Sequence, residues 1–102
     1  MREAFFIKQN DTRPALYAQL LQDGSPVDLT GCTVRFNMSS GLSREAIITD
    51  ATNGCVRYDW QEGDTAVPGV YAAEFEVTFP DGTRETFPND GFLEIVITRE
   101  VA

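Results

Sequence analysis

The segment that most constrains the fold is residues 70–79, VYAAEFEVTF, in which side chains of two kinds alternate. In an extended chain one face would carry Tyr71, Ala73, Phe75, Val77 and Phe79. A period of two is typical of a half-buried strand, because successive side chains of a β-strand point to opposite faces. The segment therefore predicts a strand with one face in the core.

Other short strands, separated by turn residues, are predicted along the sequence. They lie at residues 5–7, 15–22, 32–38, 46–49, 56–60 and 92–98, with a short edge strand at 83–87. Residues 39–44 and 61–68 are predicted polar loops, and Asn53-Gly54 is a favoured hairpin turn. No segment keeps a helical period of ~3.6 residues for long enough to predict a helix. We therefore expect an all-β fold of seven or eight short strands, an antiparallel sandwich or barrel.

Length and charge limit the domain count and the partners. The 102 residues suffice for a single domain, 1–102. Sixteen acidic residues face eight basic ones, giving a net charge of −8, which disfavours nucleic acid and anionic membranes as partners. No apolar run approaches the ~20 residues of a membrane span, and the first ten residues do not resemble a signal peptide. A cytoplasmic origin is expected, unless the protein leaves the cell within a particle.

The residues needed for common catalytic chemistry are missing. The chain has no histidine, which removes the commonest general base and every Ser-His or Cys-His nucleophile. Its glycines do not form a phosphate-binding loop. Asp64, Asp81 and Asp90 could be considered for Ca²⁺, but turn formation explains them better. A glycosidase pair of Glu74 and Glu76 is rejected because both should lie on a wet sheet face. We predict neither enzyme activity nor a cofactor.

The two cysteines are predicted to be free thiols. Cys32 shares its strand face with Val34 and Phe36 and should point inward, whereas Cys55 shares its face with Arg57 and should point outward. Side chains on such different faces do not satisfy disulfide geometry, and two thiols without histidine do not complete a zinc site. Free thiols are typical of a reducing compartment.

Several apolar side chains should remain outside the core. Tyr17 and Leu21 lie on the face opposite Leu16, and the last strand is apolar on both faces. The adjacent aromatics at positions 5 and 6 cannot both point inward from one strand. The candidate partner interface is Phe5, Phe6, Tyr17, Leu21, Arg84, Phe92 and Val96. Ordinary surface exposure is the alternative for each of them.

Four segments carry a family resemblance. VDLTGCTVRFNM (27–38), NGCVRYDW (53–60), PGVYAAEFEVTFPDGTRETFP (68–88) and FLEIVIT (92–98) resemble the N-terminal domain of phage baseplate upper proteins. The resemblance implies an immunoglobulin-like β-sandwich that anchors a longer protein to the tail tip, without catalytic residues. Residues 69–71 are similar to a tyrosine corner, in which the phenol bonds nearby backbone. This sequence stops at Ala102, so a fragment and a stand-alone tail, neck or head protein both remain open.

Two functional hypotheses follow. The first is a non-enzymatic virion protein, assembled in the host cytoplasm, that acts as an adaptor of the tail or baseplate. It would bind other virion proteins, as a homo-oligomer or in several copies within a symmetric assembly. The second is a carbohydrate- or receptor-binding module displayed on the particle, which requires exposed aromatics beside loop acids.

Overall fold

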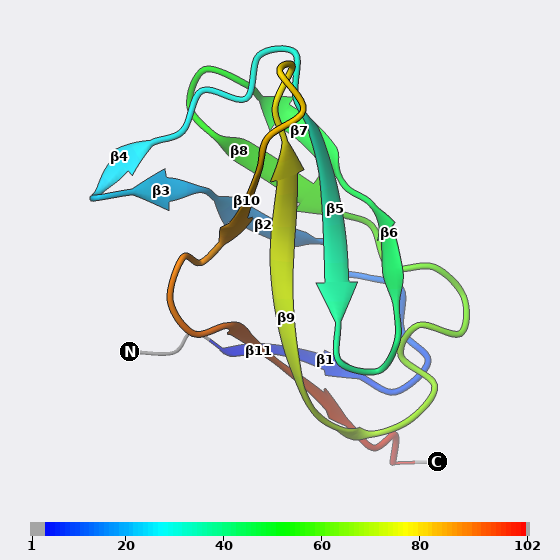
Figure 1. Ribbon diagram of the computed structural model, residues 1–102. Helices are drawn as coiled ribbons and strands as arrows, with labels where there is room; N and C mark the ends of the chain where they lie inside the picture. The colour runs from blue at the N-terminus through cyan, green and yellow to red at the C-terminus, as the bar shows by residue number, and fades with distance from the viewer. Residues whose placement is uncertain (1–3, 102) are drawn as a thin grey trace.

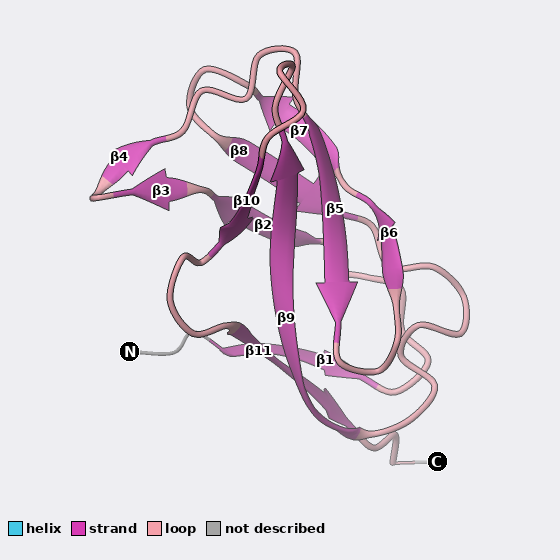
Figure 2. Ribbon diagram, viewed as in Figure 1, coloured by secondary structure: helices cyan, strands magenta, loops and turns pink. Residues whose placement is uncertain are grey.

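The structure, a computed structural model, describes residues 4–101, and all regular elements of this part are strands (Figures 1 and 2). The predicted domain limits, 1–102, include residues 1–3 and 102, which lie outside the described residues. No helix that could cross a membrane occurs in the described part. The strands are β1 (Ala4–Lys8), β2 (Leu16–Gln19), β3 (Leu21–Gln22), β4 (Ser25–Pro26), β5 (Thr33–Met38), β6 (Ser43–Glu45), β7 (Ile47–Asp50), β8 (Cys55–Tyr58), β9 (Gly69–Thr78), β10 (Arg84–Phe87) and β11 (Leu93–Thr98).

The larger sheet is organised by β9, its longest strand. The order is β1-β11-β9-β5-β6, and β10 also pairs with β9. Residues 69–73 of β9 pair with β11, and residues 75–78 pair with β10. Residues 73–78 pair with β5. The residues of β9 that pair with β5 also take part in the ladders with β10 and β11, so β5 lies on one edge of β9. β10 and β11 therefore follow one another along its other edge.

The smaller sheet has the order β2-β8-β7 and lies behind the first in Figure 1. The short hairpin β3–β4 extends from the end of β2. The two sheets enclose the hydrophobic core, so the predicted all-β sandwich is confirmed.

Three details differ from the sequence prediction. The pair β1–β11 is parallel, so the sandwich is not wholly antiparallel. Residues 43 and 44, predicted as loop, belong to β6, because Ser43, Arg44 and Glu45 pair with β5. Eleven strands are formed in the described part rather than seven or eight, since short irregular segments pair locally.

The core is centred on aromatic side chains from both sheets. Phe36 of β5 stacks on Tyr58 of β8 with ring centroids 4.5 Å apart, and it lies 5.2 Å from Phe75 of β9. Trp60 meets Phe36 and Tyr58 edge-on at 5.7 and 5.2 Å. Stacked and edge-to-face arrangements stabilise aromatic pairs beyond the effect of burial alone. The inward positions predicted for Phe36 and Phe75 are confirmed, and Tyr58 and Trp60 are buried with them.

Two further sequence predictions are confirmed locally. The Tyr71 hydroxyl donates a hydrogen bond to the carbonyl oxygen of Val67 at 2.8 Å, the backbone contact expected of a tyrosine corner. Gly54 has φ +68°, and a Cβ there would lie 2.8 Å from the carbonyl oxygens of Leu20 and Val27. The Asn-Gly turn therefore requires glycine at this position.

Matching aspartates begin two turns near one end of the sandwich. The Asp28 carboxylate accepts bonds from the Thr30 amide at 3.0 Å and hydroxyl at 2.6 Å, and Asp81 accepts the same pair from Thr83. The hydroxyl bond, followed by the amide bond, lowers the pKa of each carboxyl below its ordinary value of 3.8. Desolvation raises the pKa of Cys32, and the charges of Asp28 and Asp81 add to this effect, so the two turns are neighbours.

These turns predict a pH dependence of stability. A carboxyl whose pKa is lower in the folded than in the unfolded state stabilises the fold above the unfolded pKa, and this contribution is lost as the pH falls through the folded pKa. We expect the unfolding free energy to fall between about pH 5 and pH 2, and less steeply in the double variant Asp28→Asn, Asp81→Asn. Urea unfolding across this pH range measures the slope. Identical slopes for the two proteins would contradict the assignment.

The aromatic core predicts that alanine substitutions of two phenylalanines have very different effects on the unfolding free energy. Phe36→Ala should reduce the unfolding free energy by about 3–5 kcal/mol, because it removes a fully buried ring and leaves a cavity. Phe6→Ala is the matched control, since Phe6 is 64% exposed, and it should change stability by no more than about 0.5 kcal/mol. Urea unfolding followed by Trp60 fluorescence measures both. Equal losses would mean that the sheets are not held together by this cluster.

Candidate docking surfaces

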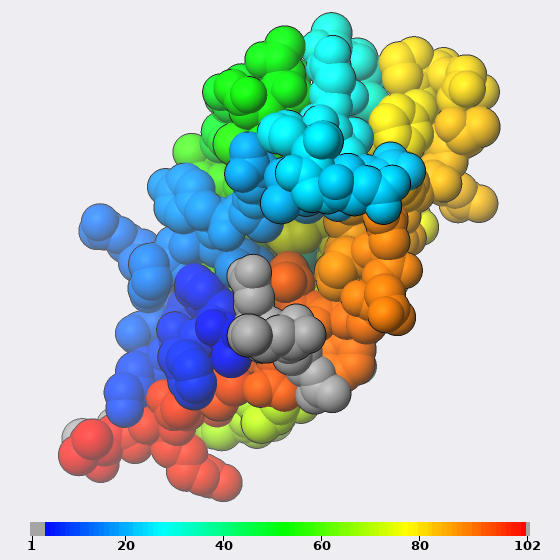
Figure 3. Space-filling model, turned by 90° about the vertical axis from the view of Figure 1, so that its left-hand side faces the viewer, coloured from blue at the N-terminus to red at the C-terminus, as the bar shows by residue number. Residues whose placement is uncertain are grey.

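A groove opens between the two sheets on the face shown in Figure 3, bordered by the hairpin β3–β4 and by the β10–β11 segment. Its volume is about 480 Å³. Phe75, Phe87 and Ile95 form its buried side, and Phe5 also lines it. Tyr17 and Leu21 are exposed where they line it. Its described lining is mainly apolar and contains neither lysine nor arginine.

The groove follows the backbone edge of β2. All residues from 16 to 21 line it, although neighbouring side chains of a strand point to opposite faces. Among the described strands β2 pairs with β8 alone, so its other edge faces the groove. The Leu20 amide donates to the Gly54 carbonyl at 2.8 Å, on the β8 side. In an antiparallel ladder the direction of the backbone groups alternates, so those of Tyr17 and Gln19 point away from β8.

An apolar row crosses the outer face of the larger sheet. Phe6 of β1 is in register with Val96 of β11, which is in register with Val70 of β9. Phe6 and Val70 are 64% and 65% exposed, and Val96 is half-buried between them. Cross-strand neighbours of this kind touch on the sheet surface. We call Phe6, Val96 and Val70 the outer row.

The outer face of the smaller sheet carries an aromatic side chain next to an ion pair. Tyr17 of β2, 68% exposed, is in register with Arg57 of β8. The Arg57 guanidinium donates to both carboxylate oxygens of Asp59, at 2.8 and 3.2 Å, and this contact raises the pKa of Arg57. With Arg13 and Pro14 these residues line a shallow basin of about 730 Å³.

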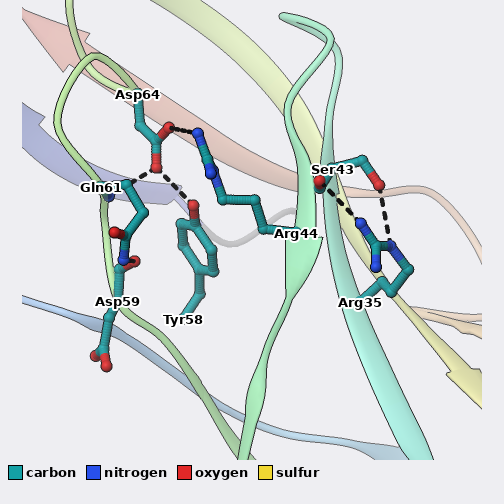
Figure 4. Close-up of polar contacts among 7 residues, drawn as sticks. All are labelled: Arg35, Ser43, Arg44, Tyr58, Asp59, Gln61 and Asp64. Carbon is teal, nitrogen blue, oxygen red and sulfur yellow. Dashed lines mark hydrogen bonds and ion pairs between the residues drawn. The ribbon is translucent and has the colours of Figure 1, made fainter.

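The loop of residues 61–68 is fixed to the sandwich by one buried carboxylate (Figure 4). Asp64, whose side chain is 4% exposed, accepts a 2.5 Å bond from the Tyr58 hydroxyl and a 2.8 Å bond from the Gln61 amide. The Arg44 guanidinium of β6 lies 3.4 Å from its other oxygen. Burial, followed by the bond to Asp64, raises the pKa of Tyr58, which therefore stays protonated and donating. Because these carboxylate contacts are within the fold, they indicate a structural role.

The sequence-predicted interface residues are distributed over several surfaces. Phe5, Tyr17 and Leu21 line the groove, and Phe5 also stacks on Trp60 with centroids 5.9 Å apart. Phe6 and Val96 belong to the outer row. Arg84 is exposed on β10, and Phe92 lines a separate shallow pocket beside β9.

Two exposed apolar residues that complete these surfaces were not predicted from the sequence. Val70 lies in the outer row, and Ile47 is in register with Arg57 on the outer face of the smaller sheet. The alternation of β9 places Val70 on the sheet face opposite to that of Tyr71, so the sequence did contain a signal for the outward position of Val70. Its neighbours on the surface depend on strand pairing, which the local pattern does not give.

The acidic residues and cysteines of the described part form no candidate metal site. Within residues 4–101 no cluster of three His, Cys, Asp or Glu side chains has metal-binding spacing. Cys32 and Cys55 are free thiols, as predicted. Among these residues the surface features that could act on another molecule are the groove, the outer row and the basin beside Tyr17.

Comparisons with known proteins agree with this picture. A sequence profile described as the BppU N-terminal domain matches residues 4–97. The N-terminal domain of phage TP901-1 ORF48 is 18% identical, with a TM-score of 0.71 over 91% of this chain and 82% of that chain. CopC from Methylosinus trichosporium OB3b is 14% identical, with a TM-score of 0.54 over 99% of this chain and 87% of that chain. At these identities the two likenesses concern the fold alone. The comparison with curated proteins gave no match.

Fold and surfaces together define a β-sandwich domain with exposed apolar side chains and an open groove. The chain belongs to the family of BppU N-terminal domains, the N-terminal domains of phage baseplate upper proteins. It is therefore a structural component of a phage tail or baseplate and a part of the virion. The resemblance stated from the sequence segments is confirmed.

The contacts of Asp64 with the loop of residues 61–68 predict that Asp64→Ala and Asp59→Ala lower the unfolding free energy by different amounts. Asp64→Ala should reduce the unfolding free energy by about 1–3 kcal/mol, because it leaves the Tyr58 hydroxyl and the Gln61 amide without their acceptor. Asp59→Ala is the control, since it removes an exposed carboxylate whose ion pair should contribute about 0–1 kcal/mol. Urea unfolding measures both. A larger loss of unfolding free energy for Asp59→Ala than for Asp64→Ala would show that Asp64 does not anchor the loop.

Proposed function

We propose that the domain is a non-enzymatic adaptor that docks other virion proteins and is present in several copies within a symmetric assembly. The observation that carries the proposal is the outer row, in which Phe6, Val96 and Val70 lie in register across three adjacent strands. Single exposed apolar residues are common, but contiguous ones on a sheet face typically mark a contact surface. Family membership supports a partner within the virion.

The other predicted interface residues extend this proposal. Tyr17 and Leu21 border the groove, and Arg84 lies on β10, which pairs with β9 alone among the described strands. An adaptor must contact more than one neighbour, and the groove and the outer row are built from different residues. They therefore offer two separate contacts.

The basin beside Tyr17 supports a second candidate function, binding of a carbohydrate. Sugars stack on exposed aromatic rings and form hydrogen bonds with planar polar groups, and here Tyr17 lies beside the Arg57–Asp59 pair. Binding on a glycan array that is lost in Tyr17→Ala would favour this function. Glycan binding that is unchanged in Tyr17→Ala would exclude the basin as the carbohydrate-binding site.

A matched pair of valine substitutions tests the adaptor function. Val70 lies in the outer row and Val67 lies outside it, and their side chains are 65% and 66% exposed. Val70→Glu should reduce the copy number of the domain in purified particles by about tenfold or more, which corresponds to ~1.4 kcal/mol of docking energy. Val67→Glu should leave the copy number unchanged.

Quantitative mass spectrometry of particles made with each variant measures the copy number. Thermal unfolding of the purified variants establishes that both fold. Absence of the wild-type domain from particles would refute the adaptor function. Equal incorporation of both variants would show that the outer row is not a docking surface.

A further inference from the structure

The groove offers backbone hydrogen-bonding groups as well as apolar surface. The amides and carbonyls of Tyr17 and Gln19 point away from β8, and residues 16–21 line the groove. Among the described strands none occupies this edge of β2. An unpaired edge is a template for another extended chain, because that chain can continue the ladder.

The apolar side of the groove suits the side chains of such a chain. A strand added to β2 would direct alternate side chains between the sheets, toward Phe75, Phe87 and Ile95. The volume of about 480 Å³ is within the ~300–1,000 Å³ of ligand-binding clefts in proteins. The groove therefore selects apolar residues at every second position of the occupant.

The charge of the groove surroundings favours one kind of occupant over another. No lysine or arginine is present among the described lining residues. The hairpin that supplies Leu21 has Asp23 at its turn, and Glu85 shares a face of β10 with Phe87. The whole chain carries a net charge of −8, so a second copy would be repelled. A segment with basic residues at its solvent-facing positions complements this surface.

We infer that the groove binds an extended, positively charged segment of another virion protein, which adds as a strand to the free edge of β2. This inference rests on the proposed adaptor function and names the kind of partner segment. Backbone bonds to Tyr17 and Gln19 hold the segment, and its alternate apolar side chains fill the groove.

The test compares two substitutions at one position. Gln19→Pro removes an amide hydrogen that faces the groove, and it leaves the bond from the Leu20 amide to Gly54 in place. Gln19→Ala is the matched control, because both substitutions remove the side-chain bond from Gln19 to the Asn53 carbonyl, and the alanine keeps its amide. The probes are overlapping peptides of about 12 residues that cover the virion proteins of the same phage, a length sufficient for one added strand.

We expect the peptides that bind to be positively charged and apolar at alternate positions. Gln19→Pro should weaken their binding by about tenfold or more, while Gln19→Ala changes it by less than about twofold. Hydrogen exchange should show protection of the Tyr17 and Gln19 amides when the tightest peptide is bound. Thermal unfolding of both variants controls for folding.

Other outcomes overturn the inference. These are the absence of any binding peptide, equal binding by the two variants, exchange protection elsewhere, or a dimer of this chain that Gln19→Pro abolishes. The adaptor function is judged separately, by the particle content of Val70→Glu and Val67→Glu. Normal incorporation of the wild type without peptide binding would refute strand addition and leave the adaptor function in place.

Discussion

The contact on which the rest of the structure depends is the stacking of Phe36 on Tyr58, at 4.5 Å between the two sheets. Phe75 and Trp60 complete the cluster, so the central strands β5, β9 and β8 are held at a fixed separation. Tyr58 also links this core to the 61–68 loop, because its hydroxyl donates to Asp64. The core and the loop are therefore held together through one side chain, Tyr58.

Strand β9 connects those surfaces. Its inner side supplies Phe75 to the core and to the groove, while its outer side supplies Val70 to the outer row. The succession of β10 and β11 along one edge of β9 opens the sandwich between Phe87 and Leu93, where the groove lies. One strand therefore determines the position of both proposed docking surfaces, and a change in its register would move them together.

Much of the fold could be predicted because the period of two depends on local sequence alone. It identified the inward faces of β5, β8 and β9, and it indicated that the adjacent aromatics at positions 5 and 6 do not both point inward. The pattern does not specify which strands pair, so the parallel pair β1–β11 and the alignment of Val70 with Val96 were not foreseen. The polar segment containing β6 has no apolar alternation, because β6 is an exposed edge strand paired with β5.

The parallel pairing of β1 with β11 has a mechanical consequence. Ala4 begins β1 and Thr98 ends β11, at opposite ends of a ladder whose strands run in the same direction (Figure 1). Tension applied between these two residues would load all hydrogen bonds of the ladder in shear at the same time, whereas an antiparallel pair would be peeled open bond by bond. Such a topology resists stretching of the chain between these two residues.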